Sequence, residues 1–186
     1  TRIHIVDSQD SANGMATASP SPQILLYATG PEIDSSLQYH DQWLRTLIVH
    51  EYTHVVHLQM QHGVSRVVNS VFGDVYLLNG MQPRLFVEGL AVLMETRWTT
   101  KGRIRSSYYN MVIRTHALEG RLQTLDQASN STTAYPRGTA DYVYGAMFMA
   151  WLEQRVGMEK LVAICHRYAS SPLPFGVNRV FREVTG

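Results

Sequence analysis

The sequence predicts an α+β fold that is mainly helical, with a small β-sheet at its N-terminal end. Apolar residues alternate with period two near the N-terminus, and from residue 41 onward they recur at spacings of three and four. Hydrophobic residues make up 45% of the 186 residues and charged residues 17%, the balance of a folded globular chain. We expect a single domain with a strand and loop part (1–30) and a helical part (41–186).

Two short strands are expected in the first part of the chain. Residues 2–6 alternate polar and apolar side chains, and residues 23–28 form a second short strand that closes at Gly30-Pro31. The segment 7–22 between them is rich in Asp, Ser, Asn, Gly and Pro, which is typical of a loop. The sequence therefore predicts two strands with a long connection.

Helices are expected over most of the remaining chain. The first begins near residue 41 and ends before Gly63, and others cover 84–97, 142–156, 158–169 and 177–184, while 64–72 is a shorter apolar run before a turn at Gly73-Asp74. A further helix opens with the basic residues Lys101, Arg103 and Arg105 and ends near Gly120. The polar segment 126–138 reads as a loop.

Composition excludes several classes of protein. The formal net charge is +1, without the basic excess of nucleic-acid-binding proteins, and the positive charges over 103–121 are expected to form a solvated helix face. The single cysteine, Cys165, rules out an internal disulfide and is expected to be a buried thiol. Apolar stretches such as 145–152 fall far short of the roughly 20 residues that a membrane span needs.

The most specific chemical signal is His50-Glu51-Tyr52-Thr53-His54, an H-E-x-x-H sequence inside the first predicted helix. Residues four apart lie on one face of a helix, so both imidazoles can reach a single metal ion. Glu51 points about 100° round the helix, which places its carboxylate beside a metal-bound water. The motif predicts a catalytic metal site in which Glu51 takes a proton from that water.

A third ligand is expected from a later helix. A catalytic zinc has three protein ligands and an open position for water. A histidine six residues after His54 cannot supply the third ligand, because that position is Met60. Glu88 fits, since it is an acid inside an otherwise apolar helix and a buried carboxylate needs a compensating partner.

Glu95 lies seven residues after Glu88 and therefore on the same helix face. Two interpretations stay open at this stage. Glu95 either accepts a hydrogen bond from a ligand histidine and fixes its tautomer, or forms a surface ion pair with Arg84 or Arg97.

His57 shares the face of the two histidines of the motif. It is expected either to contact a ligand residue without binding the metal itself or to pack against the next helix, because a fourth ligand would close the water position. Three other histidines have no motif and are expected to be ordinary surface or loop residues: His40, His62 and His116.

The pairing of His50-Glu51-x-x-His54 with Glu88-Gly-x-Ala and Glu95 resembles the gluzincin zinc metallopeptidases. More narrowly, it is similar to the bacterial peptidase MA-like catalytic domains, which occur in extracytoplasmic proteins that carry β-propeller repeats. The likeness covers most of the chain, although only the zinc residues are specific. Further similar segments are Asp10-x-x-Asn13-Gly14, Trp43-Leu44, Leu122-x-x-Leu125-Asp126 and residues 142–148.

The resemblance implies a zincin-like catalytic domain with one zinc ion per chain, bound by His50, His54 and Glu88. Glu51 would be the general base and then the proton donor to the leaving amine. A tyrosine three residues before a glycine stabilises the oxyanion in the aminopeptidase branch, and Tyr142 matches that place, with Tyr144 as a rival.

The resemblance also implies a peptide or protein substrate and a periplasmic or secreted bacterial location. A β-propeller domain is then expected elsewhere in the full-length protein, and the chain, which starts at Thr1 and stops at Gly186, is expected to be a catalytic domain cut from that longer protein. No nucleic-acid partner is expected.

Two departures from the aminopeptidase branch favour an endopeptidase. The stretch between His54 and Glu88 is longer, and no Gly-x-Met-Glu-Asn segment is present to hold a free N-terminus. Segment 24–29 is expected to be an edge strand along which an extended substrate pairs. Other functions stay open: a catalytically silent zincin-like binding domain, a metal hydrolase of a non-peptide substrate, or a scaffold in which the motif is accidental.

Overall fold

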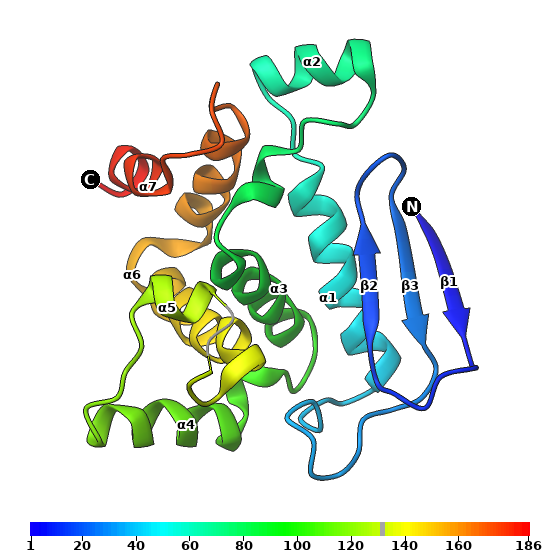
Figure 1. The fold of residues 1–186 in the computed structure, drawn as a ribbon, viewed down its shortest axis with the longest axis vertical. Coiled ribbons are helices and arrows are strands. Elements are labelled where there is room, and N and C mark those ends of the chain that lie inside the picture. Colours follow the sequence, from blue (N-terminus) through cyan, green and yellow to red (C-terminus); the bar gives the residue numbers. More distant parts are fainter. Residues whose placement is uncertain (131–132) are drawn as a thin grey trace.

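A computed structural model describes residues 1–130 and 133–186 and has the expected α+β fold, mainly helical with a small N-terminal sheet. The strands β1 (Arg2–Val6), β2 (Gly14–Thr17) and β3 (Gln23–Tyr27) lie beside helix α1 (Trp43–Leu58) (Figure 1). Helix α3 (Arg84–Trp98) lies on the other side of α1, and α6 (Ala140–Ala169) packs against α3.

Helices α4 (Ser107–Leu118), α5 (Leu125–Ser129) and α7 (Val177–Thr185) pack against α6. Helix α2 (Val64–Phe72) lies apart from them, beyond the end of α1 (Figure 1). Short 3-10 turns cover Leu78–Met81, Arg103–Arg105 and Arg137–Thr139. Helix α6 contains the two helices expected over 142–156 and 158–169, joined at Gly157, whose φ of 82° interrupts the helical backbone.

The order of the strands corrects two predictions. The sheet runs β1-β3-β2, with β3 parallel to β1 and antiparallel to β2. The segment 7–22, expected to be a loop, contains β2, and the expectation that 24–29 is an edge strand is wrong because β3 lies between its two neighbours. Strand β2 is hard to recognise because it has only four residues and lies among Gly and polar residues, although it pairs with the next strand, β3. The edge strand that faces α1 is β2.

Two other segments differ from their predictions. Helix α5 lies at the start of the expected loop 126–138, with a capping box in which the Thr124 side chain accepts from the Gln127 backbone N–H; residues 131–132 lie outside the described part. The basic segment from Lys101 does not open a helix, because Arg103–Arg105 form a 3-10 turn and α4 begins only at Ser107.

The main hydrophobic core lies between α3, α6 and α7. Cys165 is 2% exposed, as expected, and burial raises the pKa of its thiol to about 12. No helix in the described ranges combines the length and the apolar character that crossing a membrane requires. The residues of this core are Leu78, Phe86, Leu90, Leu93, Met149, Leu152, Leu161, Ile164, Cys165, Tyr168 and Val180.

Candidate metal centre

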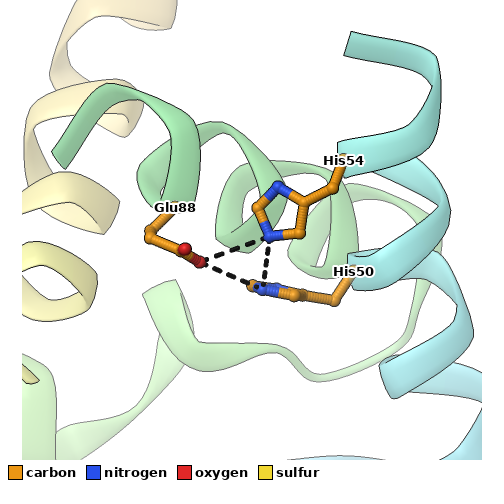
Figure 2. A group of neighbouring side chains, drawn as sticks. All are labelled: His50, His54 and Glu88. Atoms are coloured by element: carbon orange, nitrogen blue, oxygen red, sulfur yellow. Dashed lines mark hydrogen bonds and ion pairs between the residues drawn. The ribbon is translucent and has the colours of Figure 1, made fainter. Parts of the chain in front are cut away.

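His50 and His54 on α1 and Glu88 on α3 point toward one another in the interior (Figure 2). The two Nε2 atoms are 3.2 Å apart, and Glu88 Oε2 lies 3.4 Å from that of His50 and 3.3 Å from that of His54. Both histidines are buried, and the Glu88 side chain is 14% exposed. The three residues form a group that could hold a metal ion.

The spacing of these three atoms matches a tetrahedral metal site. With ligand distances of about 2.0–2.1 Å, two ligand atoms of a tetrahedral zinc lie about 3.3 Å apart. Glu88 Oε2 is buried and has no hydrogen-bond partner among the described residues. A buried carboxylate oxygen aimed at two imidazole nitrogens is costly unless a cation satisfies all three, so the residues fit a metal ion.

The protonation states of Glu88 and His50 depend mainly on the charged side chains that contact them. Burial alone would raise the pKa of Glu88, but the imidazoles of His50 and His54 outweigh it and hold that pKa well below its ordinary value. Burial likewise acts to lower the pKa of His50, and the carboxylates of Glu88 and Glu95 raise it overall. Glu88 is therefore ionised at neutral pH, the form in which a carboxylate can bind a metal ion.

Glu95 is the hydrogen-bonding partner of a candidate ligand, which decides between its two interpretations. Its side chain is 1% exposed, and Oε2 lies 3.1 Å from His50 Nδ1. When Nδ1–H donates to this carboxylate, the Nε2 lone pair of His50 is left facing Glu88 and His54. The alternative ion pair of Glu95 with Arg84 or Arg97 is not formed: Arg84 pairs with Asp141 and Glu88, and Arg97 with Glu153.

Arg103 is a buried part of the candidate centre that the sequence did not predict. It was expected on a solvated face, yet it is 8% exposed and donates from Nε to Glu95 Oε1 at 2.8 Å and from Nη2 to Oε2 at 2.7 Å. Burial raises the pKa of Glu95, but Arg103 outweighs burial and lowers this pKa to about 2. The sequence signal for this position is Gly102, because glycine readily adopts the positive φ, here 98°, at which the chain turns back toward α3.

Glu51 lies beside the ligands, under strand β2. It is 6% exposed, and an added Cβ on Gly14 would come within 3.0 Å of its Oε1. Only glycine lets the strand pass this close to the carboxylate. Burial raises the pKa of Glu51, against the lowering effect of His50 and His54, which strengthens it as a proton acceptor.

The two rival tyrosines occupy different environments. The Tyr142 ring stacks on His50 with centroids 6.2 Å apart and lines the cavity at the centre. Burial raises the pKa of Tyr142, so its hydroxyl keeps its proton at neutral pH. The Tyr144 hydroxyl instead lies 2.7 Å from His116 Nδ1 and accepts from the Gln123 backbone N–H. His116 is consequently buried, contrary to its prediction as a surface residue.

His57 packs on the neighbouring helix and does not reach the three ligand atoms. It is 1% exposed, and its ring lies 6.1 Å from that of Phe86 on α3. Burial lowers the pKa of His57 to about 3, with His54 acting in the same direction, so the ring is neutral. This outcome matches the packing alternative for His57.

A cavity of about 480 Å³ opens onto the candidate ligands between β2, α1 and the start of α6. Its walls also include Tyr39 and Trp43, which precede or begin α1, and these too were not expected at the site. Comparison of the chain with protein-family models, with curated proteins and with solved structures gave no match.

Proposed function

We propose that this chain is a zinc-dependent peptidase, and specifically an endopeptidase. The observation that carries the proposal is the triangle of His50, His54 and Glu88 ligand atoms, 3.2–3.4 Å apart, with the Glu51 carboxylate beside it. Two imidazoles and one carboxylate are the donor set of many catalytic zinc sites, and three protein ligands leave a position open for water.

A zinc ion held there would supply a Lewis acid that makes water more acidic and polarises the substrate carbonyl. Glu51, with its raised pKa, accepts the proton of the attacking water and then returns it to the leaving amine. The Tyr142 hydroxyl, which stays protonated, donates a hydrogen bond to the oxygen on which negative charge develops. Each step thus has a residue that lines the same cavity.

Strand β2 supports an extended polypeptide as the substrate. Gly14, Met15 and Ala16 line the cavity, and in the described part of the chain no strand pairs with the outer edge of β2. A peptide that adds to this edge would run past Glu51 with its backbone held by main-chain hydrogen bonds. Such binding needs no free terminus, which favours internal cleavage.

The test is cleavage of a fluorescence-quenched peptide library by the zinc-loaded protein. We expect Glu51→Gln to keep one zinc per chain and to lower turnover by about 10²–10⁴-fold, the usual contribution of a general base. Glu159→Gln, at an exposed position of α6, is the matched control. Cleavage that survives Glu51→Gln, or a chelator, contradicts the proposal, and zinc binding without turnover favours a silent binding domain.

A further inference from the structure

Arg103 contacts both halves of the candidate site. We propose that Arg103 is a positioning residue that orients the ligand His50 through Glu95 and, independently, fixes the ring of Tyr142. The inference rests on the proposed zinc peptidase, because it assigns these two residues their roles. It adds a residue that neither the metal motif nor the predicted ligand set contains.

The first contact is with Glu95. The guanidinium donates to both carboxylate oxygens, at 2.8 and 2.7 Å, and the Arg103 backbone N–H donates to Oε1 at 3.1 Å. Three donors hold a carboxylate that is 1% exposed, so its plane is fixed and Oε2 faces His50 Nδ1. A partner that orients a ligand histidine usually changes metal affinity by about 10–100-fold when removed.

The second contact is with Tyr142. The guanidinium carbon of Arg103 lies 5.2 Å from the centroid of the Tyr142 ring, within cation–π range. Nη2 of the same guanidinium is 2.8 Å from His50 Nδ1, a close contact that is not a hydrogen bond when Nδ1–H donates to Glu95, and the His50 ring stacks on Tyr142. Arg103 therefore lies where His50, Glu95 and Tyr142 meet, and a planar guanidinium can contact all three.

The turn that carries Arg103 is anchored to the end of α3, the helix that carries Glu95. An added Cβ on Gly102 would overlap Thr96, the Ile104 N–H donates to Thr96 Oγ1 at 3.3 Å, and Arg105 donates to the backbone carbonyls of Thr96 and Lys101. The position of the Arg103 guanidinium relative to Glu95 is thus fixed by the backbone.

An alternative role for Arg103 is to neutralise the buried charge of Glu95. Substitution of Arg103 by lysine distinguishes this role from positioning. Lysine keeps the charge but loses the paired hydrogen bonds and the planar stacking. For Arg103→Lys we expect zinc affinity, measured by chelator competition, to fall about 10–100-fold. The matched control is Arg105→Lys in the same turn, whose side chain binds only backbone carbonyls and which should keep wild-type zinc affinity.

A double variant separates the two contacts. Arg103→Met combined with Glu95→Gln removes both charges of this ion pair and leaves neither partner unpaired, so it keeps the comparison available if Arg103→Lys does not fold. We expect it to bind zinc as weakly as Glu95→Gln alone, but to have a kcat about tenfold lower, at similar KM, because Tyr142 loses its support. When the same double variant is made in a Tyr142→Phe background, zinc affinity should still fall, but kcat should stay at the value of Tyr142→Phe alone.

Zinc affinity decides the proposal without reference to cleavage. If Arg103→Lys binds zinc as tightly as the wild type, the positioning role is overturned. If Arg103→Lys does not fold, the double variant takes its place, and wild-type zinc affinity of the double variant likewise overturns the role. A protein that binds zinc tightly, loses affinity on Arg103→Lys and cleaves no peptide would support Arg103 and contradict the peptidase.

Discussion

Gly89 on α3 and Gly145 on α6 lie in direct backbone contact, because an added Cβ on Gly89 would come within 2.5 Å of the Gly145 carbonyl oxygen. Two helices can approach this closely only where neither carries a side chain at the crossing. Glu88 immediately precedes one glycine, and Tyr142 lies one turn before the other. The crossing therefore sets the separation of a candidate ligand and the candidate oxyanion donor.

Gly145→Ala should destabilise the fold and loosen the metal centre. Its methyl group would overlap the Leu85 carbonyl oxygen, a backbone atom that cannot move without shifting α3. Overpacking of this kind costs about 1–3 kcal/mol, which exceeds the gain in helix propensity from alanine. Urea unfolding measures the loss, and Gly80→Ala, where the nearest atom would be 3.8 Å away, is the control. Equal unfolding midpoints for the two variants would contradict the tight crossing.

Gly14→Ala should impair turnover while zinc affinity is kept. The new methyl group would lie 2.9 Å from Leu47 Cδ1 and 3.0 Å from Glu51 Oε1, so β2 or the Glu51 carboxylate must shift. Displacement of a catalytic group by about 1 Å can cost about 10²-fold in rate. Steady-state kinetics with chelator competition tests this, with Gly30→Ala as control, where the nearest atom is 3.9 Å away. Reduced zinc affinity with intact kcat would be the opposite of the expected result.

Tyr142→Phe and Tyr144→Phe should separate catalysis from stability. Tyr142→Phe removes the proposed oxyanion donor, so kcat should fall about 10²–10³-fold with zinc binding and unfolding nearly unchanged. Tyr144→Phe breaks the buried hydrogen bonds to His116 and Gln123 and should cost about 1–3 kcal/mol of stability without a comparable loss of kcat. If Tyr144→Phe gave the larger kinetic defect, the assignment of the oxyanion donor would be wrong.

Features that depend on local spacing were predictable from the sequence. The i, i+4 relation of His50 and His54 is a property of one helix, and an acid in an apolar helix needs a partner, which singled out Glu88. Most of the longer helices were predicted because their apolar periodicity extends over several turns. The structure places the ligand atoms of these three residues together, as expected.

Features that depend on where distant segments meet were not predictable. Arg103 is a surface residue by composition and becomes buried only because a 3-10 turn after α3 folds back onto Glu95. This contact is set by tertiary packing, on which period and propensity carry no information. Strand β2 was missed for a different reason: it pairs with the nearby β3 but is only four residues long, too short for a clear period-two pattern.

His57 should make the metal-free protein less stable in acid. Its pKa is about 3 in the fold, against an ordinary value of 6.5, so between these pH values the unfolded chain binds a proton that the folded chain does not. A group with this depressed pKa therefore reduces the free energy of unfolding as the pH falls from 6.5 toward 3. The slope from one such proton is at most about 1.4 kcal/mol per pH unit.

His57→Leu removes this proton uptake and should flatten the pH dependence over that window. Urea unfolding of the metal-free protein at several pH values measures it, because zinc binding is itself pH-dependent. Glu95 also loses stabilisation in acid, as its pKa is lowered to about 2, but this contribution is common to both proteins and cancels in the comparison. His4→Leu on β1 replaces an exposed histidine and is the control. Equal slopes for wild type and His57→Leu would show that His57 takes up its proton in the folded chain.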